Sequence, residues 1–303
     1  MRIDRLELRD FRNYRQQAAD FDPRCNVIFG ENAEGKTNLL EAVICLSRGK
    51  SPLARSDGEL IRFDADSASL AGQIFARDRV FRTEIDLFRG QRRRMRVNQV
   101  PARNAAALGS VFQTVFFCPD DLFLIREGAA ARRRFMDSAL CQLRPRYAGA
   151  LAEYERAYEQ KTRILRDHEE KPSLLQLLPD FNERLVRSGA VLVGYRARFV
   201  QKLAEYAAAA HAECSGGKER LEIRYETVSS VSDPLAETET VAGQLRTHME
   251  AHGQAELAAR LCLSGPHKDD LAVSINGRDA RAFSSQGQTR TAALALKLAE
   301  REL

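Results

Sequence analysis

The segment that most constrains this chain is FGENAEGKTN, residues 29–38. Its Gly30-x-x-x-x-Gly35-Lys36-Thr37 spacing matches the phosphate-binding loop pattern in full. Glycines let the backbone curl until successive N–H groups converge on phosphate oxygens, and a helix that follows adds its positive N-terminal end. The pattern therefore predicts a nucleotide site, and a tight turn without a ligand is the weaker interpretation.

The residues on either side of the loop supply the context that the motif needs. The apolar run Val27-Ile28-Phe29 predicts a short strand over 26–29. Residues 37–47, TNLLEAVICLS, place apolar side chains at helical spacing and predict a helix directly after the loop. A contiguous strand, glycine loop and helix argues against a chance match.

We expect Lys36 to contact the β- and γ-phosphates and Thr37 to ligate Mg²⁺. The predicted nucleotide-binding residues of this segment are Gly30, Glu31, Asn32, Ala33, Glu34, Gly35, Lys36 and Thr37. A loop of this kind does not name the function by itself, because kinases, GTPases, helicases and transporter motors share it.

The rest of the chain divides into a β region and a helical region. Residues 3–8 read as a strand, and alternating apolar positions over 69–99 predict an antiparallel β region. From about residue 132 the apolar period becomes helical, with a break at Pro172 and a stop signal, SGG, at 215–217. Two long helices joined through such a break predict an antiparallel helical hairpin.

The last part of the chain returns to strands and closes on a helix. The segments RLEIRYETV and LAVSINGRD alternate in polarity, and Asn276-Gly277 predicts a tight hairpin turn. Residues 285–288, Ser-Gln-Gly-Gln, stand at the start of a helix with leucines inside it. A serine hydroxyl and glycine N–H groups at a helix N-terminus form a second anion site. We therefore add Ser285, Gly287 and Gln288 to the predicted nucleotide-binding residues.

Composition excludes several classes of protein. The 303 residues contain no apolar run long enough to span a bilayer and no apolar stretch resembling a signal peptide at the start, so we expect a cytoplasmic protein with no membrane association. Six cysteines lie far apart without a C-x-x-C pair, which argues against disulfide frameworks and zinc sites. Of the 47 basic residues only eight are lysines, and the arginine excess is by itself weak evidence for nucleic-acid binding.

Together, the two anion motifs resemble those of an ABC-type ATPase head, and over its whole length the chain resembles the RecF family of bacterial DNA-repair ATPases related to SMC heads. The resemblance rests on several ordered motifs: RLELRDFRNY, GENAEGKTNLLEA, FFCPDDLFLIREGAAARRRFMD, LSGPHKDDL and SQGQTRTAALALKLAE. It implies an α/β fold, a P-loop ABC-type ATPase head with an inserted helical lobe. We divide the chain into an ATPase lobe with the phosphate loop (1–118), a helical lobe (119–220), and a segment with the return strands and the signature helix (221–303).

The resemblance also implies a function. ATP and Mg²⁺ would join two subunits into a homodimer, with the Lys36 site of each capped by Ser285 and Gly287 of the other. The dimer would close on duplex or gapped DNA in recombinational repair, replication-fork maintenance and the SOS response, with slow hydrolysis as the release step. RecR and RecO are the implied protein partners.

Two departures from the family pattern bear on catalysis. Ala33 stands where many ABC heads have glycine, and its side chain is small enough for the loop. The family continues beyond the signature helix to an acidic (Walker B) pair, whereas this sequence ends at Leu303, so no catalytic residue is assigned and we expect negligible ATP hydrolysis. Two alternatives stay open at this point: a structural clamp that binds ATP without turnover, and a P-loop small-molecule kinase.

Other candidate residues carry less information. Two arginine runs, 92–94 with Arg96 and 132–134, are candidates for DNA phosphate contacts, although a solvated face is the usual explanation of such a run. His248 and His252 are four residues apart but lack the glutamate of a zinc-protease motif. The sequence assigns no role to His267 or to the Asp269-Asp270 pair.

Overall fold

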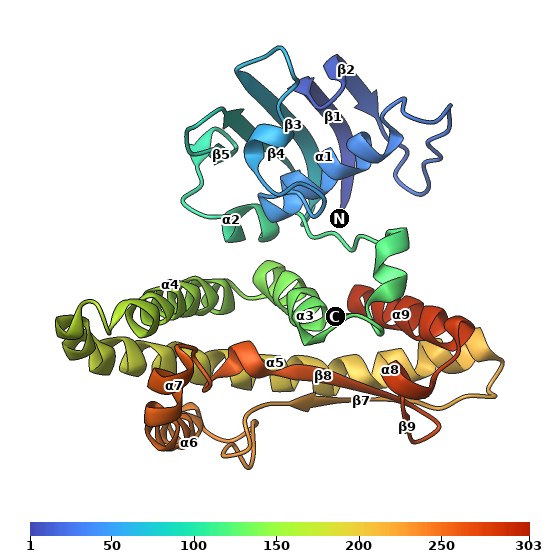
Figure 1. The fold of residues 1–303 in the computed structure, drawn as a ribbon. Helices are drawn as coiled ribbons and strands as arrows, with labels where there is room; N and C mark the ends of the chain where they lie inside the picture. The colour runs from blue at the N-terminus through green and yellow to red at the C-terminus, as the bar shows by residue number, and fades with distance from the viewer. The chain divides into compact units, whose positions relative to one another are not determined.

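A computed structural model describes all of residues 1–303, which form two compact units, Met1–Phe116 and Phe117–Leu303 (Figure 1). Residues 221–303 pack with the helices of the second unit. The three-part division drawn from the sequence stays a prediction. None of the helices combines the length and the apolar character that crossing a bilayer requires.

The first unit is built on a six-stranded antiparallel sheet with the strand order β2-β1-β3-β4-β5-β6. Helix α1 packs against β3, β4 and the short helix α2. The elements are β1 (Arg2–Phe11), β2 (Tyr14–Asp20), α1 (Lys36–Arg48), η1 (Asp57–Glu59), β3 (Ser67–Ala76), β4 (Arg79–Phe88), β5 (Arg94–Val97), β6 (Val100–Pro101) and α2 (Ala106–Gly109).

The core of this unit follows from the strand period. Every second residue of β3 is buried, as the predicted alternation requires, and the buried face receives the apolar stripe of α1. Gly72 permits the close approach of helix and sheet, because a Cβ at this position would lie 2.7 Å from a methyl carbon of Leu46. The helix that follows the phosphate loop is therefore anchored along its length on a rigid sheet.

The strand predicted over 26–29 is wrong for this structure. Residues 21–29 form no strand, and the side chains of Val27 and Phe29 are exposed. The local order of this segment comes instead from a polar turn, in which Asn26 Oδ1 accepts the Asp22 N–H at 2.8 Å. A strand exists only where a neighbour completes its hydrogen-bond ladder, and no described strand lies beside these residues.

The second unit is organised around one long helix, α5. Helices α4, α6 and α9 and strand β7 all pack on it (Figure 1). The two long helices expected from the sequence are α4 and α5, joined through a 3₁₀ segment that begins at Pro172. The helical elements are η2 (Pro119–Phe123), α3 (Ala129–Leu143), α4 (Pro145–Asp167), η3 (Pro172–Leu177), α5 (Leu178–Ser215), α6 (Thr238–Ala251), α7 (Gly253–Ala259), η4 (Pro266–Lys268), α8 (Ala280–Phe283) and α9 (Gln286–Arg301).

A small antiparallel sheet completes the unit, with β8 (Asp270–Ile275) between β7 (Leu221–Glu226) and β9 (Arg278–Asp279). The predicted turn at Asn276-Gly277 joins β8 to β9, with φ of 52° and 75° at its two residues. Asparagine and glycine tolerate this left-handed conformation better than other residues, which is why the pair marks such turns.

A buried ion cluster holds the elements of the second unit together. The guanidinium of Arg196, on α5, donates to both carboxylate oxygens of Asp137 on α3 and, at 2.9 Å, to Asp269 Oδ2 just before β8. The same guanidinium donates at 2.7 Å to the carbonyl of Pro266, and the Tyr225 hydroxyl on β7 donates to Asp269. One cation thus joins a helix pair to the sheet.

The cluster predicts a large loss of stability on removal of its cation. Arg196→Ala would leave the fully buried Asp269 carboxylate without a counter-charge, which costs about 3–5 kcal/mol of unfolding free energy for a buried ion pair. Urea unfolding measures the loss. Arg198→Ala, an exposed neighbour on the same helix, is the control. Equal stability of the two variants would contradict the central role of Arg196.

Candidate functional site

The phosphate loop has the backbone conformation that its glycines allow. Gly30 and Gly35 have φ of 151° and 101°, in the region that favours glycine, and α1 begins at the next residue, Lys36. Ala33 also lies in the left-handed region, at 69°. Its methyl group is the smallest side chain that can occupy this position, so the departure from the family pattern leaves the curl of the loop intact.

The Lys36 side chain folds back over the loop. Its ammonium donates to the carbonyl oxygens of Gly30 at 2.8 Å and Glu31 at 2.5 Å. This places a positive charge on the concave side of the loop, beside the backbone groups that curl around it. The structure therefore brings together the lysine and the loop that the sequence motif predicted.

The N-terminus of α1 is open. Its N-cap is Gly35, which has no side chain, and no side chain accepts a hydrogen bond from the first turn. The N–H groups of the first turn have no intrahelical acceptor, and they combine with the positive end of the helix dipole. Thr37 is exposed in this turn, and its hydroxyl has no partner within the chain. The donors and the free hydroxyl fit a phosphate and its metal ion.

Three residues that support the loop were not assigned from the sequence. Asn13 donates from Nδ2 to the Glu34 carbonyl at 3.1 Å, and the Tyr14 hydroxyl donates to the Gly35 carbonyl at 3.1 Å. Asn38 in turn donates to Asn13 Oδ1 at 2.9 Å. A Cβ at Gly35 would lie 2.6 Å from Asn13 Nδ2, so the close packing requires glycine.

The turn that carries Asn13 is tied to α1 by an ion pair. Arg12 contacts both carboxylate oxygens of the fully buried Glu41, at 2.9 and 2.8 Å. The FRNY segment between β1 and β2 thus acts as a brace for the loop. Its residues appear in the sequence only as part of a family motif, and no local pattern predicts that they reach across to residues 34–41.

The Glu34 carboxylate occupies part of the loop. Its Oε2 accepts the Glu31 N–H at 2.9 Å, and a Cβ on Gly30 would lie 2.2 Å from the same oxygen. A negative charge therefore satisfies one of the backbone donors that a phosphate oxygen would otherwise use.

The second predicted anion motif belongs to the second unit. Ser285 is the N-cap of α9, and its Oγ accepts the Gln288 N–H at 3.2 Å. Gln288 Oε1 accepts the Ser285 N–H at 2.9 Å, which completes a capping box. We call residues 285–288 the signature turn. Ser285 and Gly287 are exposed there, as an anion site requires.

His267 and the Asp269-Asp270 pair have structural roles here. His267 Nδ1 lies 2.6 Å from the Tyr154 hydroxyl and its Nε2 3.0 Å from the Cys262 carbonyl, and burial lowers the pKa of this histidine to about 4. Asp269 belongs to the Arg196 cluster, and burial raises the pKa of its carboxyl.

Asp270 forms a two-pronged ion pair with Arg132 on α3, and both of its oxygens lie 2.7 Å from the guanidinium. The remaining nitrogen of Arg132 donates to carbonyls at the start of the unit, including that of Glu127 at 2.7 Å. Arg132 is therefore buried and occupied, and only Arg134 of the 132–134 run is exposed.

The other arginine run is also partly used within the chain. Arg93 pairs with Asp57, and Arg96 pairs with Glu84 and Asp86. Arg92 and Arg94 are exposed and pair with no acidic side chain. Arg94 lies over the Phe88 ring. In the other run, Arg133 donates to the Asp269 carbonyl at 2.7 Å and Arg134 lies 3.8 Å from a carboxylate oxygen of Glu127. Five of the seven candidate arginines therefore have a partner within the chain, and Arg92 and Arg94 remain available.

His248 and His252 stack with their ring centroids 4.0 Å apart. No group of three or more histidine, cysteine, aspartate or glutamate side chains is arranged to hold a metal ion. The stacked pair accordingly gives no support to a metalloprotease-like centre.

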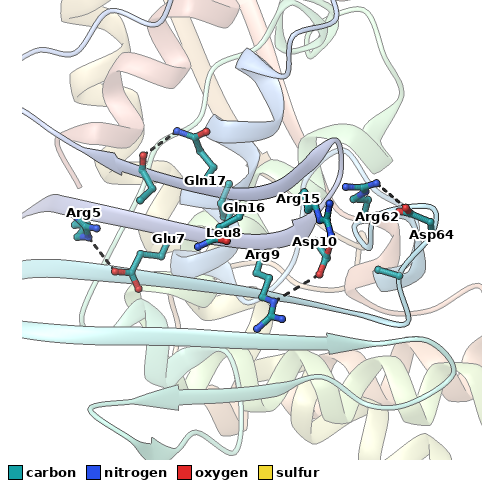
Figure 2. A pocket seen from close by; sticks show the side chains of 12 residues that line it. Arg5, Glu7, Leu8, Arg9, Asp10, Arg15, Gln16, Gln17, Arg62 and Asp64 are labelled. Atoms are coloured by element: carbon teal, nitrogen blue, oxygen red, sulfur yellow. Dashed lines mark hydrogen bonds and ion pairs between the residues drawn. The ribbon is translucent and has the colours of Figure 1, made fainter.

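A cavity of about 810 Å³ lies over β1 and β2 and is lined by no residue of the phosphate loop (Figure 2). Its charges pair among themselves: Arg5 points to Glu7 and Arg62 to Asp64 (Figure 2). A smaller cavity of about 380 Å³ is lined by Asn13, Asn38 and the exposed ring of Phe63, among others. The smaller cavity adjoins the loop supports and is the more relevant to a nucleotide.

Comparisons with known proteins agree with one another. A family model described as an AAA domain matches residues 5–188. The DNA replication and repair protein RecF of Lachnoclostridium phytofermentans is 37% identical over 303 residues, which cover 100% of this chain and 81% of that protein. The RecF protein of Bacillus subtilis is 34% identical over 304 residues, covering 100% of this chain and 82% of its own length.

Solved structures give the same result. The recombination mediator protein RecF solved with ATP in the RecFOR pathway is 30% identical to this chain, with a TM-score of 0.92 over 99% of this chain and 80% of that one. An Smc head domain from Pyrococcus furiosus, at 16% identity and a TM-score of 0.50, shares the fold alone and covers 99% of this chain and 79% of its own. The chain has the fold of a P-loop ABC-type ATPase head and belongs to the RecF family of DNA replication and repair proteins.

Proposed function

We propose that this protein binds ATP with Mg²⁺ and uses it to dimerise on DNA during recombinational repair and replication-fork maintenance. Slow hydrolysis would be the release step where the acidic pair that the family carries after the signature helix is present. The observation that carries the proposal is the Lys36 ammonium held against the Gly30 and Glu31 carbonyls in a loop that opens onto an uncapped helix. The solved RecF protein with ATP supports the same nucleotide for this chain. Membership of a DNA-repair family favours this function over a small-molecule kinase.

The loop residues divide the work of holding the nucleotide. Lys36 would exchange its two carbonyl partners for β- and γ-phosphate oxygens. The N–H groups of the first turn of α1 would donate to the phosphates at the N-terminal end of the helix. Thr37 would ligate Mg²⁺, which supplies charge neutralisation of the phosphates when bound. The cavity lined by Phe63 offers room for the nucleoside, with an aromatic face on which a base can stack.

The signature turn would act across a two-fold dimer. Ser285 would present its hydroxyl, and Gln286 and Gly287 their free N–H groups, to the γ-phosphate of the nucleotide held by the other subunit. A symmetric dimer with one loop and one signature turn per subunit forms two equivalent composite sites. ATP would then contribute directly to the interface, so its presence would drive association.

DNA would be held through its backbone. Arg92 and Arg94 are exposed and pair with no acidic side chain, so they can contact phosphates without first breaking an internal ion pair. Arg134 is exposed as well, and its guanidinium lies 3.8 Å from a carboxylate oxygen of Glu127. Contacts of this kind carry no sequence information. We propose RecR and RecO as protein partners, since the solved relative is described within the RecFOR pathway, and the cytoplasm as the location.

The first test removes the charge in the loop. Lys36→Ala should reduce Mg-ATP affinity by roughly 100-fold or more, because a charge-assisted contact to two phosphates is lost. Titration with a fluorescent ATP analogue measures the affinity, and circular dichroism checks that the fold survives. Lys50→Ala, an exposed lysine of the same unit, is the control. Unchanged affinity of the Lys36 variant would exclude a nucleotide site here.

A second test concerns Glu34. Glu34→Gln should tighten Mg-ATP binding by roughly three- to tenfold, because the repulsion between two like charges close together at a surface is about 1 kcal/mol or more. The amide oxygen can still accept the Glu31 N–H, so the loop keeps its shape. Asp78→Asn, in the β3–β4 turn, controls for the change in net charge. Weaker binding by the Glu34 variant would mean that the carboxylate helps to hold the nucleotide.

The dimer model predicts that Ser285 acts on the other subunit's nucleotide. Ser285→Arg should leave ATP binding by the monomer within about twofold of wild type and abolish ATP-driven dimerisation, because the long charged side chain fills the space for the partner's γ-phosphate. Sedimentation with and without ATP measures association, and Ser229→Arg at an exposed position is the control. Loss of ATP binding in the monomer would instead place the serine in its own subunit's site.

DNA binding should be strong at low salt and indifferent to sequence. Each phosphate contact contributes roughly −0.9 to the slope of log K against log salt, so the double variant Arg92→Gln, Arg94→Gln should make the slope shallower by up to about 2. Arg96→Gln, whose guanidinium is held by two carboxylates, is the matched control. A flat salt dependence in the wild type would contradict a backbone clamp.

A further inference from the structure

The segment between α5 and β7 returns the chain to the last turns of α5. Gly216 and Gly217 have φ of 62° and 73°, and the Gly217 N–H donates to the Ala212 carbonyl at 2.8 Å. Two consecutive left-handed residues end the helix and reverse the chain. Helix α9 packs on α5. Glu219, two residues after Gly217, lies between the end of α5 and the start of α9, where it contacts His211 and Gln288.

Glu219 decides which way the Gln288 amide points. Gln288 Nε2 donates to Glu219 Oε1 at 2.8 Å, while Gln288 Oε1 accepts the Ser285 N–H at 2.9 Å. A carboxylate can only accept hydrogen bonds, so the NH₂ group must face Glu219 and the amide oxygen must face Ser285. Glu219, which lies outside the signature turn, therefore fixes the orientation of the Gln288 amide in the capping box.

His211 orients Glu219 in turn. Its side chain is fully buried on α5, with Nε2 3.2 Å from Glu219 Oε2, and its Nδ1 has no partner. Because the carboxylate must accept, Nε2 carries a hydrogen. The buried Nδ1 has no acceptor to receive a hydrogen, which favours a bare lone pair there. A buried acceptor without a partner is tolerated more easily than a buried N–H, so the arrangement is consistent with a neutral ring in a single tautomer.

We propose that Glu219 and His211 are positioning residues for the signature turn. A directional set of hydrogen bonds, from His211 Nε2 and Gln288 Nε2 to Glu219 and from the Ser285 N–H to Gln288 Oε1, holds the turn ready for a partner's phosphate. The proposal rests on the function proposed above. Its consequence lies at Ser285. The Oγ is held as the acceptor of the Gln288 N–H, so its own hydrogen is free to be donated outward, and the N–H groups of Gln286 and Gly287 stay open.

A positioning role and a purely electrostatic role of Glu219 predict opposite effects of its removal on ATP-driven association. Glu219 carries a negative charge near a site that would bind phosphate, so by charge alone its removal strengthens ATP-driven association. If its role is positioning, Glu219→Ala frees the Gln288 amide and weakens association. Glu219→Gln loses the same charge but keeps an oxygen for Gln288 Nε2. His211 can move its hydrogen to Nδ1 so that Nε2 accepts from the new amide, and the buried Nδ1–H without a partner then lowers the folding stability of the variant while the signature turn keeps its contact.

The experiment measures ATP affinity of the monomer and the dissociation constant of the ATP-bound dimer for full-length chains. Glu219→Ala should raise the dimer dissociation constant roughly tenfold or more, as expected for a lost hydrogen bond to a charged group, with monomer ATP affinity within about twofold. Glu219→Gln should stay near wild type. Glu222→Ala, an exposed glutamate on β7, is the matched control.

Two further measurements do not depend on dimerisation. In the unliganded monomer, hydrogen exchange at residues 286–288 should accelerate in Glu219→Ala by more than the change in global unfolding free energy accounts for. ¹⁵N chemical shifts should report a bare Nδ1 on His211 in the wild type and a protonated Nδ1 in Glu219→Gln. A bare Nδ1 in both, or unchanged exchange in Glu219→Ala, would overturn the positioning role.

Comparison of the Ser285 and Glu219 variants distinguishes failure of the positioning role from failure of the proposed dimer. If Ser285→Arg retains full ATP-driven dimerisation, the trans role of the signature turn is wrong and both proposals fail. If Ser285→Arg abolishes dimerisation while Glu219→Ala leaves the dissociation constant unchanged, only the positioning role fails. The same conclusion follows if the alanine and glutamine variants at position 219 tighten association equally, because the effect of Glu219 is then its charge.

Discussion

The second unit depends on the buried guanidinium of Arg196. It neutralises carboxylates from α3 and from the residue before β8, Asp137 and Asp269, and it also binds the Pro266 carbonyl. A planar group with five donors in fixed directions is suited to join three elements at once. Because a buried charge without its partner is costly, these contacts allow little variation in how α3, α5 and β8 pack together. The signature helix α9 also packs on α5, so its position depends on how α5 is held.

Both candidate anion sites use the same chemistry with different supports. The first turn of each helix has N–H groups with no intrahelical acceptor, and a ligand can satisfy them. At α1 the cap is a glycine, and the loop is braced from β1–β2 by Asn13 and Tyr14. At α9 the cap is Ser285, and its support is the Gln288 amide held by Glu219. In both cases, the residue that braces the site lies far from it in the sequence or in a different element.

Local pattern predicted the elements more reliably than it predicted their partners. The glycine loop, the helix after it and the Asn276-Gly277 turn follow from neighbouring residues, and all are present. The strand over 26–29 failed because a strand needs a second strand beside it, which no local pattern specifies. The arginine runs show the same limit. Arg132 and Arg134 are near neighbours in one basic run, yet one is buried against Asp270 and the other is exposed.

The sequence by itself determined the family motifs, the phosphate loop with Lys36 and Thr37, and the signature turn, because each needs particular residue types at a short, regular spacing. Only the tertiary structure decided which side chains hold these motifs in place. The Glu219–Gln288 contact spans 69 residues, and the contact between Arg196 and Asp269 spans 73. Contacts of this length arise from the packing of helices and strands, which selects partners by position in space and leaves no periodic trace in the chain.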